Sequence, residues 1–371
     1  MDFKMQKKHF GILAIVCIVL IGCGMFGLFQ QYTFAEGAVA VNNYIPWGLY
    51  IALFLFFEAL GAGALFFAAL LDKESTTARI KLAVVGVIGS CCAGIAIMPD
   101  LGNPLQMWRL FFAPNPASPL LLDVWLLSAT IVFGVLLFVG LRWSKPGLAK
   151  VAKWGSVVFS SLLVLGTAIM FCSVAGKVGW ESTSELGISL VQALVCGVSA
   201  LALIVSGVTD ETKARLSRLA AILLVANLLL TVGEAMLMNY RDDYALKAFE
   251  AIMFGRYAPL FWIQTIVGVV VPAAMLFMGK GAKIALALAA AGVLVSKYLY
   301  VMRGSVYTTY GEISPGAYLP VLAPGEGAQM IQTYIPTMGE WFVALAVIGL
   351  AVLLVALVFN TKLVPREDQV G

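Results

Sequence analysis

Apolar runs of about 20 residues recur along this chain from its beginning to its end, and they constrain its fold more than any other feature. A run of that length is what an α-helix needs to cross the hydrocarbon core of a membrane. Only 12% of the 371 residues are charged, whereas a soluble domain carries roughly 25%. Because lipid leaves no backbone group unpaired, and because the runs are too long and unalternating for a barrel, the sequence predicts an all-α integral membrane protein.

These runs predict ten transmembrane helices in a single membrane domain that spans residues 1–371. The first run, residues 10–29, is expected to be an extra N-terminal helix that is retained, because it is longer than the core of a signal peptide and no cleavage site follows it. We expect two four-helix bundles, helices 2–5 over residues 44–173 and helices 6–9 over residues 187–302, flanked by helices 1 and 10. The expected spans are residues 10–29, 44–71, 80–98, 121–141, 154–173, 187–208, 218–239, 257–279, 284–302 and 337–360.

The positions of Lys and Arg predict how the chain is oriented. Of the 24 basic residues, 17 fall on the termini and loops of one side, six fall on the other side, and Lys297 lies within a span. The positive-inside rule makes the first side cytoplasmic, so both termini are expected in the cytoplasm and the protein in the cytoplasmic membrane. The loops of the opposite, outer side are longer, which favours that side as the working face.

Ligands for metal cofactors are scarce in this sequence. The one histidine, His9, cannot supply the two axial ligands that a membrane b-type haem usually needs. The six cysteines form no C-x-x-C pattern and fall in or at the ends of spans, where they are typical of buried small apolar residues. The sequence therefore predicts no haem, no iron–sulfur cluster and no metal in this chain.

Four ionisable residues lie in or at the ends of expected spans, where a charge is costly and is often functional. We expect Lys297 to pair with Glu234 or Glu340, which lie at a similar depth. Glu58 lies 14 residues after Tyr44, about 21 Å along a helix and past the membrane midplane, and the sequence offers no basic residue at that depth. All four charged residues are candidates for a proton path; the alternatives are a structural ion pair and, for Glu58, a neutral hydrogen-bonded acid.

Polar and aromatic residues also gather at the expected outer ends of the spans. Tyr and Trp alone would indicate an aromatic belt at the membrane interface. Amides and an aspartate beside them favour a site that hydrogen-bonds the carbonyl groups of a flat apolar molecule, and a quinone fits such a pocket in the first bundle. The candidate residues are Asn42, Asn43, Tyr44, Trp47, Asp100, Arg109, Phe171, Ser173 and Lys177.

Five motifs occur in order between residues 44 and 360. They are Y-x-P-W-G-L-Y-I-A from Tyr44, D-L-G-N-P-x-x-x-W from Asp100, P-N-P-x-S-P from Pro114, V-G-E-x-x-x-x-x-Y-R-D from Val232 and Y-I-P-T-x-x-E from Tyr334. Together they resemble the NrfD-like family, the membrane subunits of polysulfide reductase and related complexes that interact with quinones. The extra first helix and the ten spans resemble the hydrogenase-type members of that family.

The resemblance implies a haem-free subunit of a respiratory complex that exchanges electrons between a quinone and an extracytoplasmic partner, with uptake or release of protons. Menaquinone is expected in preference to ubiquinone. The implied partner is a four-cluster ferredoxin-like iron–sulfur protein or a multihaem cytochrome, which serves a catalytic subunit such as a molybdopterin enzyme or a hydrogenase. This chain alone is not expected to act on the terminal substrate.

Carried over by motif, the family's quinone contacts fall on Asn43 and its neighbours, on Asp100 and Gly102, and on Phe171. Some relatives have a histidine at the first or last of these positions, whereas this chain has none, and Phe171 cannot bond a carbonyl group. Asp100 is therefore the expected residue that exchanges protons with the quinone, followed by Tyr44 or Lys177.

Two other functions also suit a polytopic chain with buried charges. One is a secondary transporter, a class that often shows broken helices and inverted repeats. Pro272 is the only mid-span proline and has no counterpart in another half of the chain, which does not favour this alternative. The other is an inert anchor of a redox complex, in which the quinone binds elsewhere.

Overall fold

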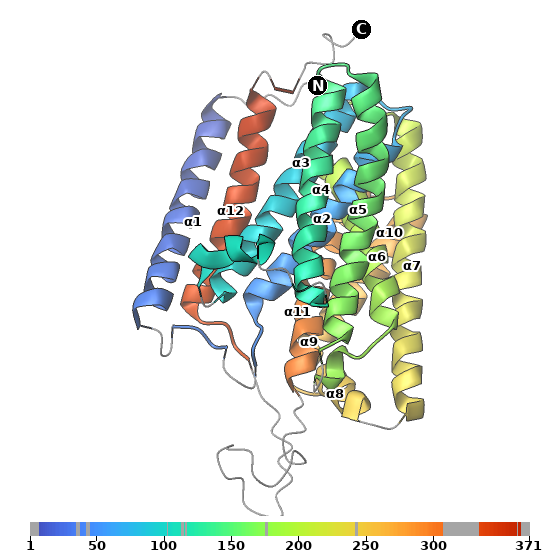
Figure 1. Ribbon diagram of the computed structural model, residues 1–371. Helices are drawn as coiled ribbons and strands as arrows, with labels where there is room; N and C mark the ends of the chain where they lie inside the picture. Colours follow the sequence, from blue (N-terminus) through green and yellow to red (C-terminus); the bar gives the residue numbers. More distant parts are fainter. Residues whose placement is uncertain are drawn as a thin grey trace, which may run out of the picture.

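The structure, a computed structural model, is built from helices, and the residues that it describes contain no β-strand (Figure 1). It describes residues 7–34, 38–41, 45–101, 103–112, 115, 117–174, 177–241, 244–306, 334–361 and 363–364. Within these ranges, ten helical segments are long and apolar enough to cross a membrane, which confirms the predicted all-α membrane fold and the ten spans.

The helices keep the order of the predicted spans. The spans are formed by α1 (Lys7–Phe34), α2 (Leu49–Leu70), α3 (Thr76–Ile97) with η1 (Met98–Asp100), α4 (Pro119–Arg142), α5 (Pro146–Cys172), α6 (Ser184–Ile204), α7 (Asp210–Arg241), the run α9 (Ala258–Ile263), η4 (Gln264–Val270) and α10 (Val271–Phe277), α11 (Ala282–Val306) and α12 (Met338–Asn360). Three short helices lie between spans: η2 (Pro104–Phe111), η3 (Val178–Trp180) and α8 (Tyr244–Met253).

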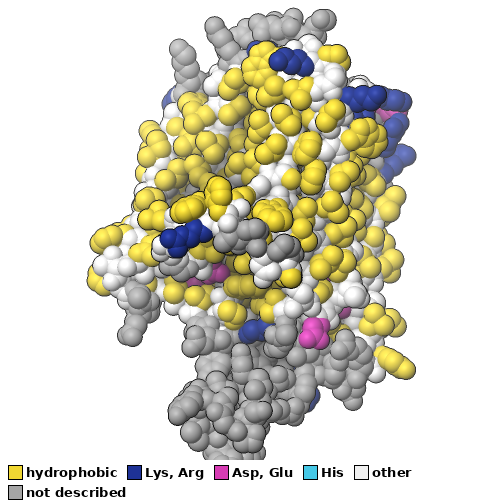
Figure 2. Space-filling model, in the orientation of Figure 1, with side chains coloured by type: hydrophobic (Ala, Val, Ile, Leu, Met, Phe, Trp, Pro, Cys, Tyr) yellow, Lys and Arg dark blue, Asp and Glu magenta, His cyan; other side chains and the backbone are white. Residues whose placement is uncertain are grey.

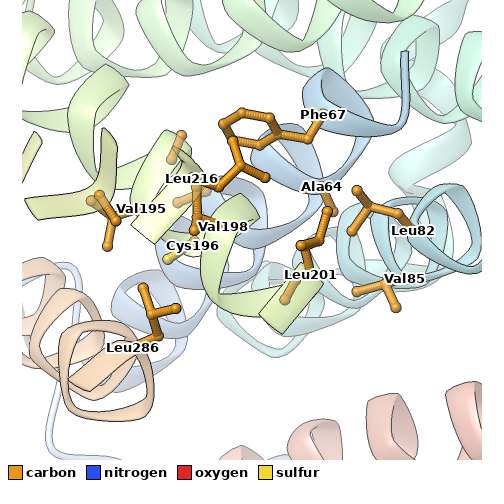
Figure 3. Close-up of a cluster of buried hydrophobic side chains, with 14 of the residues drawn as sticks. Ala64, Phe67, Leu82, Val85, Val195, Cys196, Val198, Leu201, Leu216 and Leu286 are labelled. Carbon is orange, nitrogen blue, oxygen red and sulfur yellow. The ribbon is translucent and has the colours of Figure 1, made fainter. Parts of the chain in front are cut away.

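Helix α2 lies at the centre of the molecule, since 83% of its most apolar stretch of residues is buried. It packs against α3, α5, α6 and α11. Figure 3 shows side chains of α2, α3, α6, α7 and α11 that converge in one apolar cluster, among them Phe67, Leu82 and Leu201. Because α2 contacts helices of both expected bundles, the division into two four-helix bundles stays a prediction.

Small residues allow α2 and α6 to approach until their backbones touch. A Cβ atom added to Gly63 would lie 1.9 Å from the carbonyl oxygen of Ala193, and one added to Gly197 would lie 2.4 Å from the carbonyl oxygen of Gly63. Such small-residue contacts are typical of helix pairs in membranes, where close packing stabilises the pair instead of the hydrophobic effect.

Helices α1 and α12 pack against each other on the same side of the molecule, at the left of Figure 1. Their contact again depends on glycine, because a Cβ atom on Gly24 would lie 2.2 Å from the Cβ atom of Ala346. The pair reaches the rest of the protein mainly through α12, which packs on α3 and α2. The first and the tenth span, α1 and α12, thus form a pair beside the other eight spans.

The two ends of the molecule differ in chemistry. The basic end is where α1 begins and α12 ends. It carries Lys73 in the α2–α3 turn, Arg79 in the first turn of α3 and Lys145 in the α4–α5 turn. The aromatic end is where α2 begins and α3 ends, and it carries Trp47 and Trp180. Figure 2 shows a broad belt of hydrophobic side chains on one face, with Lys and Arg side chains gathered mainly at the upper, basic end.

The eighth span is not a regular α-helix. Its middle part, η4, is a π-helix, and Pro272 follows it in α10. Proline has no N–H group to donate to the preceding turn, and a wider turn is one way in which a helix adapts to this loss. Gly268 of η4 lies directly against Gly292 of α11, so the widened turn still packs closely on its neighbour.

We predict that Gly63→Ala lowers stability, because the new methyl group overlaps the α6 backbone. Overpacking of this kind costs about 1–3 kcal/mol. The melting temperature of the purified protein in detergent measures the effect. Gly233→Ala in α7 is the matched control, since no atom lies within 4 Å of the added Cβ. Equal melting temperatures for the two variants would contradict the close approach of α2 and α6.

The hydrogen bonds between Glu74 and Thr209 at the basic end predict that stability depends on pH. Glu74, in the α2–α3 turn, accepts hydrogen bonds of 2.9 and 2.7 Å from the N–H and hydroxyl groups of Thr209. Burial acts to raise the pKa of Glu74, but hydrogen bonds from Thr212 and Thr209 outweigh it and hold the pKa below the usual 4.5. The carboxylate therefore stabilises the fold above that pH, and this contribution is lost as the pH falls through the lowered pKa.

We expect Glu74→Gln to lower the free energy of unfolding by about 2 kcal/mol at pH 7. The difference from the unchanged protein should shrink below pH 4.5, since both proteins then carry a neutral side chain at this position. Thermal unfolding in detergent across this pH range tests it. A difference that is the same at all pH values would mean that the negative charge of Glu74 does not contribute to stability.

Candidate functional site

At the aromatic end, four aromatic rings fill the space between α2, α5 and α11. The Trp47 ring stacks on Trp180 at 4.8 Å and lies 4.9 Å from Phe171, which in turn lies 5.3 Å from Tyr300. The indole N–H of Trp180 donates to the carbonyl oxygen of Tyr300 at 3.0 Å, which fixes the ring in place. The structure thus brings the predicted residues Trp47 and Phe171 together, and Trp180 packs against both.

Asp100 ends η1, beside an apolar groove of about 240 Å³ between α1, α3 and α12. Tyr32, Met98 and Pro99 line the groove near this carboxylate. In Figure 1 the η1–η2 segment, in teal, lies higher than α8. Asp100 is half-buried, and among the described residues nothing donates a hydrogen bond to it. The groove is therefore an apolar space, and Asp100 follows directly after Pro99, one of its lining residues.

Polar side chains of α1 and α2 hold this corner together. The Gln31 amide donates to the Pro99 carbonyl at 2.7 Å and accepts from the Tyr50 hydroxyl at 3.1 Å. Asp100 interacts electrostatically with Tyr32 and Tyr50. The first helix thus forms one wall of the groove and also positions the segment that carries Asp100.

Glu340 lies in the first turn of α12, fully buried, with both carboxylate oxygens in hydrogen bonds. One oxygen accepts from the Tyr334 hydroxyl at 2.7 Å, and the other accepts from the backbone N–H groups of Thr337 at 2.7 Å and Ala40 at 3.2 Å. Together with the Thr337 side chain it forms a capping box. These contacts tie the start of α12 to the chain that enters α2, since Tyr334 also accepts from the Leu49 N–H.

Lys297 is buried in α11 and pairs with Glu185 in the first turn of α6, with 3.0 Å between Nζ and Oε1. Its ammonium group also donates to the Ser189 hydroxyl at 2.6 Å. The expectation that Lys297 pairs with Glu234 or Glu340 is therefore wrong. Helix α6 begins three residues earlier than expected, at Ser184, and this brings Glu185 into the helix bundle.

Glu234 pairs instead with Arg303, at 3.1 Å, near the C-terminus of α11. The Arg303 Nε–H group donates to the Gly179 carbonyl at 2.6 Å, and its guanidinium lies 5.2 Å from the centre of the Tyr300 ring. The sequence predicted Arg303 as the first residue of a loop, whereas α11 continues to Val306. The cations of the two buried ion pairs, Lys297 and Arg303, thus lie three residues before and three residues after Tyr300 on α11.

Glu58 lies near the middle of α2, nine residues after its first residue, Leu49, and twelve before its last, Leu70. It is less deep than expected, because the helix begins at Leu49 and not at residue 44. A small cavity of about 10 Å³, close to the size of one water molecule, is lined by Glu58, Thr167 and Lys297. The expectation that no basic residue shares the depth of Glu58 is therefore wrong.

A second carboxylate lies beside Glu58. Asp123 of α4 is buried, accepts a hydrogen bond from the Thr167 hydroxyl, and interacts electrostatically with Glu58. A larger cavity of about 50 Å³ also borders Tyr300 and is lined by Glu185, Glu234 and other polar groups of α7, η4 and α11. The buried polar groups form a chain from Asp123 through Glu58, Lys297 and Glu185 to this second cavity.

The remaining predicted residues take different positions. Arg109 is exposed on η2 with its guanidinium 5.7 Å from the Trp108 ring, and Ser173 caps α5 by donating to the Met170 carbonyl at 2.7 Å. Lys177 is buried beside Trp180, and burial lowers the pKa of its ammonium group. Asn42, Asn43, Tyr44 and Gly102 lie outside the described residues.

A family model described as polysulphide reductase, NrfD, matches residues 38–309, most of the chain. The chain belongs to the NrfD family. The match covers α2 to α11, which include Asp100 and the chain of buried charges. Because the matched region begins at residue 38, it leaves out α1, the helix that forms one wall of the groove beside Asp100.

Three relatives are similar over almost the whole chain. A selenate reductase subunit of Mesobacillus selenatarsenatis is 23% identical over 97% of this chain and 94% of its own length. A putative dimethyl sulfoxide reductase membrane subunit of Halobacterium salinarum is 25% identical over 93% and 88%. An Hdr-like menaquinol oxidoreductase integral membrane subunit of Archaeoglobus fulgidus is 25% identical over 92% and 90%. This NrfD-family chain is therefore a membrane subunit of the reductase and menaquinol oxidoreductase type.

Several residues of the site were not found from the sequence. Asp123 lies in the expected span 121–141, but only two residues from its start, where the water interface tolerates a charge. Glu185 and Arg303 fell in expected loops. Tyr32 was hidden in the loop after the first span, because α1 extends to Phe34. A helical-face analysis of α4 could have found Asp123; the others needed correct helix ends.

We predict that Lys297→Met destabilises the protein, because it leaves Glu185 buried without its counter-ion. Removing one partner of a buried pair costs about 3–5 kcal/mol. The double variant Lys297→Met/Glu185→Leu should recover most of this loss, since no uncompensated charge is left. Thermal unfolding in detergent measures both. If the double variant is as unstable as the single one, the pairing is not what the lysine contributes.

Proposed function

We propose that this chain is the quinone-reactive membrane subunit of a respiratory oxidoreductase complex. The observation that carries the proposal is the Asp100 carboxylate beside an apolar groove between α1, α3 and α12. The family match and a relative named as a menaquinol oxidoreductase subunit support it. The chain binds the quinone and exchanges protons with it, the electrons pass between the quinone and a partner protein, and a catalytic subunit acts on the terminal substrate.

The residues around the groove fit a quinone ring. Such a ring is flat and apolar, with two oxygens that need hydrogen-bond partners. The groove offers apolar walls, Tyr32 lines it, and Asp100 interacts electrostatically with Tyr32. When bound, the quinone supplies the two-electron chemistry that the side chains lack. Asp100 holds or releases a proton at its carboxylate, and Tyr32 orients the ring through its hydroxyl.

The other predicted ligands lie across the same end of the molecule. Trp47 and Phe171, packed with Trp180, form a rigid aromatic wall, and buried Lys177 lies beside it. We propose Lys177 and Tyr44 as alternative proton-exchanging residues, with Asn42, Asn43, Gly102, Arg109 and Ser173 as further quinone contacts. Menaquinone is the proposed quinone.

The distribution of basic residues supports an orientation in the cytoplasmic membrane. With the basic end in the cytoplasm, both termini lie there and the aromatic end faces the extracytoplasmic side. An iron–sulfur or multihaem cytochrome subunit docks at the aromatic end and passes electrons to or from a catalytic subunit, such as a molybdopterin enzyme or a hydrogenase.

The buried charges support a proton-handling role in the same turnover. Glu58 and Lys297 line one water-sized cavity, and Glu185 and the Glu234–Arg303 pair line the next. We propose that Glu58 and Lys297 carry protons and that Glu234 keeps Arg303 in place. The hydrogen bonds of Glu340 to the start of α12 support a positioning role for that residue.

Asp100→Asn tests the proposal in the purified complex. We expect quinol-dependent reduction of the partner's iron–sulfur or haem centres to fall about 100-fold, because proton exchange with the ring loses its acceptor. Activity with artificial electron donors, which do not use the groove, should be unchanged. Asp210→Asn, an exposed aspartate at the basic end, is the matched control and should behave as the unchanged protein.

Tyr32→Phe provides a second measurement at the same groove. Loss of its hydroxyl should raise the KM for quinol with little change in assembly. Normal quinol oxidation in both Asp100→Asn and Tyr32→Phe would overturn the assignment of the groove. The ring would then have to bind near Lys177 and Trp47.

A further inference from the structure

Several hydroxyl groups in the spans of this protein bond to the backbone of their own helix. Ser128, Ser161, Ser199 and Thr231 each donate to the carbonyl four residues earlier, at 2.8–3.0 Å. This bond is the usual way in which Ser and Thr satisfy their hydroxyl groups in a membrane helix. A hydroxyl that does not make it, and is buried, therefore needs another partner.

Three hydroxyls of α4 and α5 do not make this bond, and neither do the buried hydroxyls of Ser90 on α3 and Ser305 on α11. Thr130, Ser156 and Ser160 are at most 2% exposed, and their oxygens have no hydrogen-bond partner within the described part of the protein. A buried polar group without a partner costs free energy, and a bridging water removes that cost. Three such groups in one region indicate a place where water enters between the helices.

The three hydroxyls lie along one line. Ser156, Ser160 and Thr167 are four and seven residues apart, so they share a face of α5. Helix α4 runs antiparallel beside it: Gly140 lies against Ala149, and Gly166 lies against Leu126. Asp123 of α4 lies opposite Thr167 of α5, because the two are hydrogen-bonded. Thr130 follows Asp123 by seven residues and Ser160 precedes Thr167 by seven, so in antiparallel helices Thr130 and Ser160 lie at the same height.

Each end of this line meets ionisable groups. At its inner end, Thr167 bonds Asp123 and lines the cavity that contains Glu58. At the basic end of the line, Lys153 lies three residues before Ser156 on α5. Lys153 pairs with half-exposed Asp72, and Asp72 also pairs with Arg79 at 3.0 Å. The distance along α5 from Lys153 to Thr167 is about 21 Å. The line thus leads from water at the basic end to the buried carboxylates.

We propose that Thr130, Ser156, Ser160 and Thr167, bridged by water, conduct protons between the basic end and the Glu58–Asp123 pair. A hydronium ion at the Asp72–Lys153 cluster gives its proton to the line, and a carboxylate of the pair becomes a carboxylic acid while one water is released. No electron moves in this step, and the reverse step returns the proton. The proposal rests on the proposed function only for what drives the proton during turnover.

The test uses the whole complex in proteoliposomes with the basic end facing outward. A pH-sensitive dye in the outer medium reports protons exchanged at the basic end per electron, while quinol-linked turnover is recorded in the same sample. The variant is Thr130→Val/Ser160→Ala, which removes two hydroxyls and adds no bulk. The matched control is Ser128→Ala/Ser161→Ala, which removes two hydroxyls of the same helices that already bond their own backbone.

We expect the variant to lose most of the proton exchange at the basic end, while the control keeps it. The melting temperature of the variant should not fall, since the removed hydroxyls have no protein partner in the described structure. Should the double variant fail to assemble, Ser156→Ala interrupts the same line at one position and carries the same expectation.

Two results would overturn the proposal: equal proton exchange in variant and control, or no exchange at the basic end in the unchanged protein while turnover proceeds. Absence of quinol-linked turnover in the unchanged complex would instead overturn the proposed function. Proton exchange can then still be driven by an imposed pH difference across the vesicle membrane. The line is supported if the variant slows that exchange and the control does not.

Discussion

An ammonium group in the middle of a membrane protein has to find its compensation within the protein, because lipid offers none. Lys297 meets this constraint through Glu185 and Ser189 of α6, and it lines a cavity together with Glu58 of α2. Three helices far apart in sequence are thereby brought to one point. The close approach of α2 and α6 at Gly63 makes this meeting possible, since a wider gap would separate the charges.

The same requirement explains why the polar groups form a chain and not isolated pairs. Each buried carboxylate has a cation, a hydroxyl or a second carboxylate beside it, from Asp123 to the Glu234–Arg303 pair. Tyr300 lines both cavities. A chain of this kind stabilises the fold only when every member is present, which is why removal of one member is expected to cost more than removal of a pair.

Sequence reasoning succeeded where the physical signal is local. Hydropathy depends on each residue and its neighbours, so the ten spans and the all-α fold were predictable, and motifs such as the one that begins at Asp100 indicated the family. The partners in the buried ion pairs could not be predicted, because they depend on where each helix begins and ends. Glu185 lies two residues before the expected start of its span, and Arg303 lies one residue after the expected end of another. The groove beside Asp100 escaped prediction because it needs the pairing of α1 with α12, which no local pattern encodes.

The π-helical segment of the eighth span has a consequence for how relatives are compared. A π-turn arises when one residue is added to an α-helix, and each added residue rotates everything after it by about 100° around the helix axis. Gln264 begins the segment and lines the larger cavity, whereas the residues of α10 follow the added turn. In a relative with a regular helix here, an alignment without a gap would assign cavity-lining positions to lipid-facing residues. Insertions and deletions within this span are therefore as informative about the site as substitutions.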